Sequence, residues 1–277
     1  MKAADLASLE IRLLLEGVQQ VYGYDFRDYA DASIKRRLTH WLAESGMDTF
    51  SSAQSRVLRD PTLFESLLQG ITVNVTEMFR DPDFFKALRE EVVPFLKTYP
   101  FVKIWHAGCA TGEEAYSMAI MLNEEGCAGH YRMYATDINE AVLKRAADGV
   151  VSLDQMQRFT RNYQKSGGRR SFADYYTARY DRALLSPELK RNIVFAPHNL
   201  AVDGEFGEMN MVLCRNVMIY FKSALKERCL HLFDSSLLPG GFLCLGLKET
   251  LQKSALGGGY DELKRDMRIY RKRYAQA

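Results

Sequence analysis

One stretch of the sequence, AGCATGEEA at residues 107–115, combines small residues with two adjacent carboxylates, Glu113 and Glu114. Its glycines, Gly108 and Gly112, do not have the spacing of a dinucleotide-binding fingerprint, and the stretch lacks the lysine of a phosphate-binding loop. Small residues let a ligand approach the backbone closely, but the two glutamates would repel a pyrophosphate group. A ligand with an ammonium or a sulfonium group fits this charge better, and S-adenosyl-L-methionine carries both.

A second candidate binding residue is Asp137, which follows the β-rich run YRMYAT and lies 25 residues after Gly112. An acid at the end of a second strand can accept hydrogen bonds from both hydroxyls of an adenosine ribose. Asp is also a good helix N-cap, and a helix-forming segment follows. Because Asn139 can serve as that cap, the spacing favours ribose binding by Asp137.

A mostly parallel sheet is expected to position these residues, because strand and helix patterns alternate from about residue 101. The first helix is closed by Gly126 and the second by Gly149. The tail, MRIYRKRY at 267–274, is predicted to be a final edge strand. The expected strands and helices between them are FVKIWHA (101–107), a helix over 113–126, YRMYATDI (131–138), a helix over 139–149, NIVFAPHNL (192–200), MNMVLCRNVMIYF (209–221), a helix over about 223–238, the turn PGG and GFLCLGL (241–247).

Residues 1 to about 72 are predicted to form a small helical bundle. Apolar residues recur there at helical spacing, and Ile34, Leu38, Trp41 and Leu42 form one such stripe. Gly46 is expected to end one helix, and the pair Asp60-Pro61 to start another.

An insertion is expected at about 155–192, where the helix–strand alternation breaks down. The segment 158–192 contains nine Lys or Arg residues and three Asp or Glu residues, so it is basic. Two interpretations remain open from periodicity, a small β subdomain or a solvated surface loop.

The composition argues against several classes of protein. The chain has 277 residues and a net charge of +2, which does not suit a general nucleic-acid binder. Its five cysteines form no zinc pattern and no disulfide framework, which fits a reducing cytoplasm. Neither a signal peptide nor an apolar run long enough for a membrane span is expected.

Five stretches together resemble the CheR chemoreceptor glutamate methyltransferases, in matching order and over nearly the whole chain. The resemblance implies an N-terminal helical domain at 1–73 and a donor-binding domain at 74–277. The second domain would be a doubly wound, Rossmann-like α/β sheet of the class I methyltransferase type, with an inserted small β subdomain. The stretches are NVTEMFRDPDFF (74–85), GCATGEEAYSMAI (108–120), ATDIN (135–139), HNL (198–200) and CRNVMIYF (214–221).

The resemblance also implies roles for individual residues. Glu114 would face the amino group or the sulfonium of S-adenosyl-L-methionine, and Asp137 would bind its ribose. Arg80 would orient the acceptor carboxylate, although an arginine at a helix start can also have no role. Tyr220 either borders the acceptor as a catalytic residue or is a packed aromatic. The other donor-site residues implied are Asn74, Thr76, Gly108, Gly112, Asn199, Leu200, Arg215 and Asn216, and Arg80 is also counted among them.

Some positions depart from the family pattern, but none of these changes removes a charge or a ligand. They are Met78, Ala110 and Ala115.

The expected reaction is an in-line attack of a glutamate oxygen on the sulfonium methyl group, which leaves S-adenosyl-L-homocysteine. A glutamate side chain has a pKa of about 4.3 in water, so it needs no general base at neutral pH. Alignment of the two groups can contribute about 7–11 kcal/mol. We therefore expect no catalytic triad and no metal, and none of the five histidines receives a role.

The expected partner is the cytoplasmic coiled coil of a chemoreceptor, a methyl-accepting protein, which would be met by Arg36 and Arg37 of a basic helix. The alternative is a solvated helix face, because segment 1–75 as a whole has slightly more acids than bases. We expect a cytoplasmic monomer that is recruited to membrane receptor arrays, without nucleic acid and without direct membrane insertion. Some family members hold a receptor peptide on the β subdomain, and the long basic insertion leaves that role open here.

Three other functions compete with this prediction. A methyltransferase for a different acceptor would share the donor motifs, but the helical domain and CRNVMIYF argue against it. A non-catalytic sensor of the donor would be expected to have lost a donor ligand, and none is lost. A nicotinamide-dependent oxidoreductase is disfavoured by the glycine spacing and the two glutamates.

Overall fold

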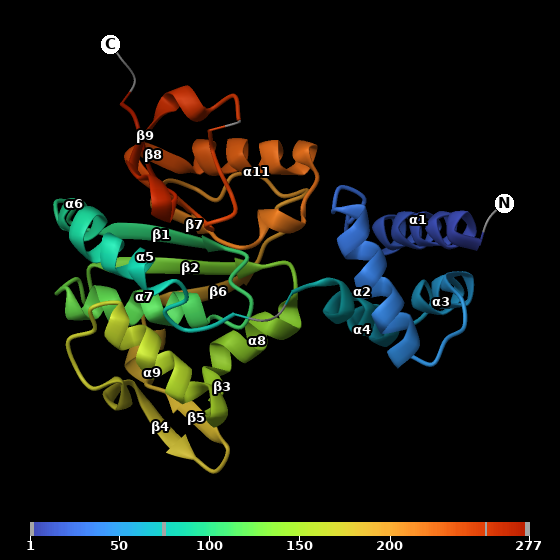
Figure 1. Cartoon of the computed structure of the whole chain (residues 1–277), viewed down its shortest axis with the longest axis horizontal. Coiled ribbons are helices and arrows are strands. Elements are labelled where there is room, and N and C mark those ends of the chain that lie inside the picture. Colours follow the sequence, from blue (N-terminus) through green and yellow to red (C-terminus); the bar gives the residue numbers. More distant parts are fainter. Residues whose placement is uncertain (1–2, 74–75, 253, 275–277) are drawn as a thin grey trace. The chain divides into compact units, whose positions relative to one another are not determined.

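The computed structural model describes residues 3–73, 76–252 and 254–274, and the chain divides into two compact units. The smaller unit holds the described residues up to 73 together with Asn199–Asp203 and Ile219–Cys229. The larger unit holds the rest. In Figure 1 the N-terminal helices of the smaller unit are blue, and the first strands of the larger unit are green.

The N-terminal helices of the smaller unit begin where local chemistry predicts. Pro61 occupies the first turn of a helix, where its missing N–H group is not needed. The Asp60 carboxylate accepts hydrogen bonds from the N–H groups of Thr62 and Leu63. The predicted helix start is thereby confirmed. The helices are α1 (Ala3–Tyr22), α2 (Asp31–Glu44), α3 (Phe50–Val57) and α4 (Pro61–Ile71).

Helices α2 and α4 pack through the predicted apolar stripe. Leu38 and Trp41 of α2 are buried, whereas Leu42 at the edge of the stripe is partly exposed. A Cβ atom on Gly70 of α4 would lie 2.9 Å from the Cβ of Trp41. A glycine at this position therefore lets the two helix backbones approach closely.

The larger unit contains the predicted mostly parallel sheet. Its order is β6-β2-β1-β7-β8-β10-β9, in which the first five strands are parallel and the last two are antiparallel to their neighbours. Figure 1 shows β1 and β2 side by side with their arrows in the same direction. The strands are β1 (Val102–Ala107), β2 (Tyr131–Asp137), β6 (Ile193–Pro197), β7 (Met209–Cys214), β8 (Leu237–Leu245), β9 (Tyr260–Lys264) and β10 (Ile269–Lys272).

The strand order fixes where a ligand is expected to bind. Strand β1 has β2 on one side and β7 on the other, so the chain reverses its direction of winding at β1. Open α/β sheets bind ligands at such a point, outside the carboxyl ends of the strands. Helices α7 (Glu113–Glu124), α8 (Glu140–Asp148) and α11 (Ser223–Ser236) follow β1, β2 and β7 in the chain.

The last strands differ from what the sequence predicts. The tail strand β10 is not at the edge, because it pairs with both β8 and β9 and buries Ile269 and Tyr270. Strand β9 was not predicted, since YDELK buries Tyr260 but lacks an apolar alternation. The PGG segment is also not a separate turn. It lies inside β8, at an irregularity in the β7–β8 register where Gly240 has a φ of 79°.

The inserted segment is a folded β subdomain and not a loop, and it is coloured yellow in Figure 1. Its antiparallel sheet has the order β3-β5-β4 and begins at Val150, before the predicted start. The insertion also contains a helix that the sequence analysis missed, whose residues Met156, Phe159 and Tyr163 are buried at helical spacing. The elements are β3 (Val150–Ser152), α9 (Met156–Lys165), β4 (Tyr176–Arg179), β5 (Arg182–Leu185) and α10 (Pro187–Lys190).

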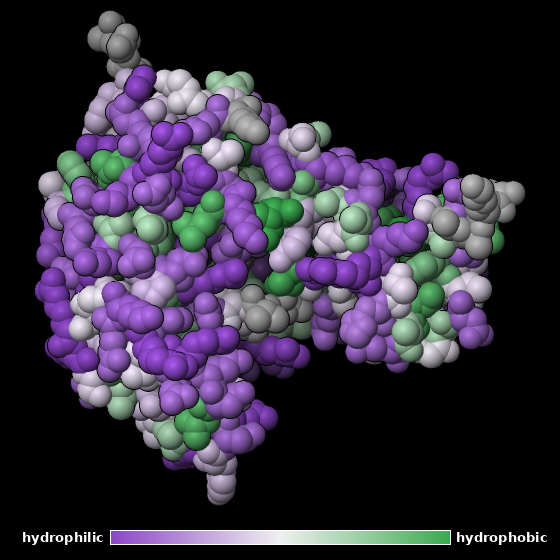
Figure 2. Space-filling view, in the orientation of Figure 1, coloured by the Kyte–Doolittle hydropathy of each residue, from purple (hydrophilic) through white to green (hydrophobic). Residues whose placement is uncertain are grey.

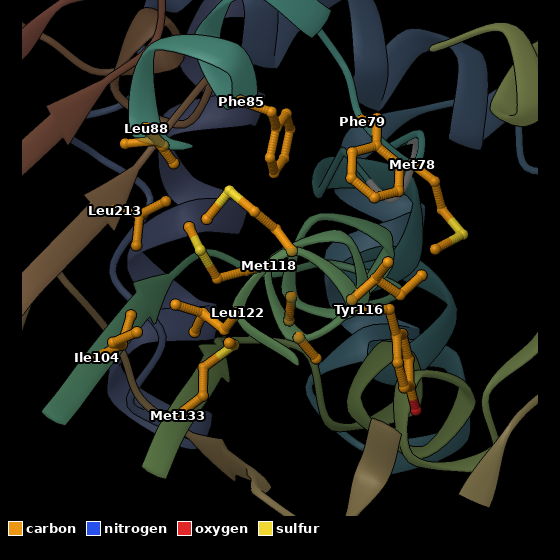
Figure 3. Close-up of a cluster of buried hydrophobic side chains, with 14 of the residues drawn as sticks. Met78, Phe79, Phe85, Leu88, Ile104, Tyr116, Met118, Leu122, Met133 and Leu213 are labelled. Carbon is orange, nitrogen blue, oxygen red and sulfur yellow. The ribbon is translucent and has the colours of Figure 1, made fainter. Parts of the chain in front are cut away.

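The core of the larger unit lies between helix α7 and the sheet. Figure 3 shows Met118 and Leu122 of α7 beside Ile104 and Met133, which come from β1 and β2. All four side chains are almost completely buried. Phe85 and Leu88 belong to the helical segment α5 (Pro82–Ala87), η1 (Leu88–Val92) and α6 (Val93–Leu96), and they pack against the same core.

The surface carries few large hydrophobic side chains. Hydrophilic residues dominate the visible face, with isolated hydrophobic ones between them (Figure 2). The most exposed of the large hydrophobic residues is Tyr180, which is 98% exposed at the turn between β4 and β5. In the described part of the chain, every helix is too short or too polar to cross a membrane.

Candidate active site

The glycine turn between β1 and α7 has a backbone that ordinary residues rarely adopt. Gly108 has a φ of 80° and Gly112 a φ of 88°, and Ala110 between them also has a positive φ of 48°. A Cβ atom on Gly108 would lie 2.5 Å from a methyl group of Val217, which follows β7. The turn is thus packed directly against the loop at the end of β7, and a side chain at Gly108 would separate them.

Asp137 ties this turn to the end of β2. Its two carboxylate oxygens accept hydrogen bonds from the N–H groups of Ala110 (2.9 Å) and Asn139 (3.0 Å). Burial raises the pKa of Asp137, and these backbone hydrogen bonds partly offset the rise. The cap of α8 is Asn139, whose side chain accepts a hydrogen bond from the N–H of Ala141. Asn139 is therefore the N-cap of α8, and ribose binding by Asp137 stays a prediction.

The two adjacent glutamates of the turn have different surroundings. Glu113 is buried and accepts a hydrogen bond from the Thr111 hydroxyl at 2.6 Å. Burial raises the pKa of Glu113, and this hydrogen bond only partly offsets it. Glu114 instead points to Arg215 and His106. Its Oε2 lies 2.6 Å from Nη1 of Arg215, and its Oε1 lies 3.5 Å from Nδ1 of His106.

The electrostatic balance keeps Glu114 ionised. Burial raises the pKa of this carboxyl, but the charge of Arg215 and the hydrogen bond from His106 outweigh it and lower the pKa to about 2. The side chain of Glu114 is 15% exposed, so a small part of it remains accessible. A carboxylate held in this way can face a positively charged ligand.

Arg215 connects Glu114 to a loop far away in the sequence. Its side chain is fully buried, and its Nη2 lies 2.6 Å from Oδ2 of Asp81. The guanidinium also lies over the ring of Phe84, 3.9 Å from the ring centroid. The chain of ion pairs Asp81–Arg215–Glu114, centred on the buried Arg215, joins the carboxyl edge of the sheet to the loop that carries Arg80. Breaking a buried pair of this kind by removing one partner typically costs about 3–5 kcal/mol.

The predicted site loop at 76–81 is backbone-strained on both sides of Arg80. Phe79 has a φ of 51° and Asp81 a φ of 55°, values that residues other than glycine rarely adopt. Arg80 and Thr76 are partly buried. Arg80 forms no hydrogen bond or ion pair with any residue that the structure describes. Asn74 lies outside the described residues.

The loop after β7 depends on a residue that the sequence analysis missed. Glu249 is buried, and its carboxylate accepts hydrogen bonds from the N–H groups of Asn216 (3.1 Å), Val217 (3.1 Å) and Gly246 (2.6 Å). Asn216 has a positive φ of 62°. Glu249 thus holds the loops after β7 and β8 in place, next to Arg215. No local sequence signal could have found it, because its partners are backbone groups.

The smaller unit also holds the predicted site residues Asn199, Leu200 and Tyr220. Asn199 accepts a hydrogen bond from the N–H of Ala201, and Leu200 is buried. Tyr220 is partly buried, and its ring lies under the guanidinium of Arg37 at 4.9 Å. The roles of these three residues stay predictions.

The two arginines of α2 differ in how they are held. Arg36 is exposed, as expected. Arg37 is partly buried and donates hydrogen bonds to the backbone oxygens of Ile71 (3.2 Å) and Thr72 (3.1 Å) at the end of α4. Burial lowers the pKa of Arg37. Arg37 therefore already has a structural role, whereas Arg36 is available for a partner.

The other side chains that the sequence analysis missed are Asp81 and His106. Asp81 sits directly after Arg80, and its adjacency to a predicted site residue was the available signal. His106 lies at the end of β1, and the sequence predicts no role for it. Its Nε2 atom and the Nε atom of Arg215 are buried without a hydrogen-bond partner among the described residues. Among all the residues that the structure describes, no group of three His, Cys, Asp or Glu side chains could hold a metal ion.

S-adenosyl-L-methionine fits the residues present at this edge of the sheet. The oxygens of Asp137 accept hydrogen bonds from backbone N–H groups, and a carboxylate has about four acceptor positions, so it can also accept from ribose hydroxyls. Glu114 supplies a negative charge for an ammonium or a sulfonium group. The glycine turn joins these two carboxylates, since Ala110 in the turn bonds to Asp137 and the helix that begins after Gly112 carries Glu114.

Two family models match the chain. The model described as "CheR methyltransferase, SAM binding domain" matches residues 74–257. The model described as "CheR methyltransferase, all-alpha domain" matches residues 9–72. Together they span most of α1, helices α2–α4 and most of the larger unit.

Several relatives are similar over most of their length. "Putative methyltransferase Cher3" of Pseudomonas putida is 51% identical over 95% of this chain and 97% of its own. A chemotaxis protein methyltransferase of Listeria innocua is 30% identical over 86% of this chain and 88% of its own. One from Salmonella typhimurium is 27% identical over 88% of this chain and 85% of its own.

Solved structures give weaker similarity. The N-methyltransferase NodS of Bradyrhizobium japonicum, in complex with S-adenosyl-L-homocysteine, is 15% identical over 61% of this chain and 62% of its own, with a TM-score of 0.33. A likeness at this level carries no argument about the acceptor.

Proposed function

The chain belongs to the CheR methyltransferase family of S-adenosyl-L-methionine-dependent chemotaxis protein methyltransferases, and from this premise we propose that its acceptors are glutamate side chains. They would lie on the cytoplasmic signalling helices of chemoreceptors, and the products would be glutamate methyl esters for sensory adaptation. The observation that carries the proposal is the chain of ion pairs Asp81–Arg215–Glu114, since it links the donor-binding turn to the loop of Arg80.

The proposed donor site lies at the carboxyl ends of β1, β2 and β7. Asp137 accepts the ribose hydroxyls, and Glu114 faces the amino group or the sulfonium. Arg215 acts through Glu114, because it orients the carboxylate and keeps it charged. Asn74, Thr76 and Asn216 complete the site, with Gly108 and Gly112 in the turn and with Asn199 and Leu200 beside the adenine.

The proposed chemistry depends on positioning rather than on proton transfer. The donor supplies an electrophilic methyl group on a sulfonium when it is bound. An acceptor glutamate is already a carboxylate at neutral pH, since its pKa in water is about 4.3. Arg80 binds and orients this carboxylate, and Tyr220 borders it. As the new C–O bond forms, the C–S bond breaks and S-adenosyl-L-homocysteine leaves, so no base and no metal are needed.

The proposal extends to the domains and the partner. We assign the helical domain to 1–73 and the methyltransferase domain to 74–277, and the family models that match 9–72 and 74–257 support this division. The partner is the receptor coiled coil, and Arg36 is better suited to meet it than Arg37, which is engaged by α4. The protein would work as a cytoplasmic monomer recruited to receptor arrays.

The test is methyl transfer from labelled S-adenosyl-L-methionine to receptor cytoplasmic domains, with donor binding measured in parallel by calorimetry. We expect a base-labile label on the receptor with the wild type. Arg80→Ala should lower transfer at least about 100-fold, far more than it lowers donor binding, because orientation of the acceptor is lost. Arg265→Ala, an exposed arginine elsewhere in the larger unit, is the matched control. If the protein binds the donor but labels no receptor, the proposal that receptor glutamates are the acceptors is wrong. If Arg80→Ala transfers methyl groups at the wild-type rate, the proposed role of Arg80 is wrong.

A further inference from the structure

The loop that carries Arg80 is held by the inserted subdomain. Asn162 of α9 donates a hydrogen bond from its side-chain amide to the backbone oxygen of Met78 at 3.1 Å. On the same loop, Arg158 of α9 forms an ion pair with Glu77 at 3.0 Å. The contact through Asn162 is partly buried, so water does not compete freely with it. Helix α9 thus binds the backbone of the loop two residues before Arg80.

The next residue of the loop, Phe79, is fixed from two sides. Its ring is fully buried and packs edge-to-face on Tyr163 of α9 (5.2 Å between centroids) and on Phe172 of the insertion (6.3 Å). Its N–H group donates to the Ser117 hydroxyl at 2.8 Å, and this hydroxyl donates to the backbone oxygen of Glu113 at 2.7 Å. These contacts hold Phe79 at its unfavourable φ of 51°.

Buried charged side chains also attach helix α9 to the rest of the larger unit. Arg89 forms ion pairs with Glu124 (2.5 Å) and Glu125 (2.8 Å) and donates to the backbone oxygen of Ser166 at the end of α9. The hydroxyls of Tyr163 and Tyr175 both donate to Glu124. Since Glu124 ends α7, which begins at the donor turn, the insertion and the turn belong to one rigid framework.

We propose that Asn162 is a positioning residue for methyl transfer, because it holds the Met78–Phe79 backbone so that Arg80 meets the acceptor. The inference rests on the proposed role of Arg80 and gives the inserted subdomain a function inside the active site. The insertion would then be needed for the chemical step itself, in addition to any contact that it makes with a partner.

The first test is a double-mutant cycle on receptor methylation. Asn162→Asp keeps the shape of the side chain but cannot donate to Met78, and it should lower kcat about 10-fold or more with a change in donor affinity below about twofold. In the Arg80→Ala background the same change should have almost no further effect, since Arg80 is the residue through which Asn162 acts. Gln164→Ala, an exposed change on the same helix, should leave kcat unchanged in both backgrounds.

Two results of the cycle would overturn the proposal. One is wild-type kcat in Asn162→Asp, and the other is an equal loss with and without Arg80. If Arg80→Ala itself is fully active while Asn162→Asp is not, the assignment of Arg80 fails and so does the idea that Asn162 positions it.

The second test does not depend on any acceptor. Hydrogen exchange of a peptide spanning 77–85, in the full chain with S-adenosyl-L-homocysteine present, reports on the Phe79 N–H group that Ser117 holds. Exchange in Asn162→Asp should be several-fold faster there than in the wild type, while peptides from α7 and β1 remain equally protected. Unchanged exchange at 77–85 would overturn the proposal. Faster exchange everywhere would mean that the variant is simply less stable, and this outcome would also count against a local positioning role.

Discussion

At the scale of single residues, the site separates two neighbouring glutamates by their surroundings. Glu113 has a hydroxyl partner and a raised pKa, whereas Glu114 has Arg215 and His106 and a pKa of about 2. Adjacent positions on a helix point about 100° apart, so only one of them reaches the guanidinium. Of the two carboxyl groups of the turn, Glu114 is therefore the one held as a carboxylate by a neighbouring positive charge.

The depressed pKa of Glu114 predicts a specific dependence of stability on pH. Because the folded-state pKa is about 2 and the ordinary value is 4.5, the contribution of Glu114 is fully present above pH 4.5 and is lost as the pH falls towards 2. Its size is about 3 kcal/mol in order of magnitude. The difference in unfolding free energy between wild type and Glu114→Gln should therefore narrow over this range. Chemical denaturation at several pH values measures it, and a difference independent of pH would contradict the assignment.

At the scale of elements, the turn after β1 depends on close packing as well as on backbone conformation. Gly108 and Gly126 have the same φ of 80°, but only at Gly108 would a Cβ atom meet a neighbour, 2.5 Å away on Val217. Nothing lies within 4 Å of the corresponding position on Gly126. Comparing substitutions at Gly108 and Gly126 therefore separates the free-energy cost of the backbone angle from the free-energy cost of crowding.

We expect Gly126→Ala to destabilise the chain by about 1 kcal/mol from the backbone angle alone. Gly108→Ala should cost about 1–3 kcal/mol more because of overpacking, and it should also weaken binding of S-adenosyl-L-homocysteine. Thermal unfolding and calorimetry measure both effects. Equal destabilisation by the two substitutions would show that the contact with Val217 has no energetic weight.

Helix α2 provides a test of receptor contact that distinguishes two adjacent arginines. Arg36→Glu should slow methyl transfer, because it reverses an exposed charge, and it should leave the unfolding temperature nearly unchanged. Arg37→Glu should lower the unfolding temperature, since it removes hydrogen bonds to the last carbonyls of α4. Transfer rates at low and high salt, measured together with thermal unfolding, distinguish a loss of receptor contact from a loss of stability. Normal transfer by Arg36→Glu would remove the steering hypothesis.

At the scale of the whole molecule, local signals predicted most elements but not their long-range contacts. The start of α4 at Asp60-Pro61 and the βαβ order from residue 101 follow from capping and periodicity. Strand β9 was missed because YDELK shows one buried residue in five. Helix α9 was missed because glycine, arginine and tyrosine dominate the following segment and conceal the short apolar stripe.

The candidate site was predictable only as far as its motifs extend. The motif residues Glu114 and Arg215 were both named from the sequence, but their ion pair joins positions 101 apart in the chain. The backbone contacts of Glu249 and Asn162 carry no sequence signal, because any residue offers the same N–H or C=O group. These contacts make the insertion, the donor turn and the Arg80 loop one connected framework, which no single motif could have indicated.

The most direct measurement of the central claim is the identity of the methylated atom. Receptor cytoplasmic domains would be treated with the wild-type chain and labelled S-adenosyl-L-methionine, and the labelled peptides mapped by mass spectrometry before and after mild base. The account predicts methyl esters on glutamate side chains of the signalling helices, which mild base removes and Glu→Gln substitution of the receptor abolishes. A base-stable methyl group on a nitrogen, or label found only in small molecules, would contradict it.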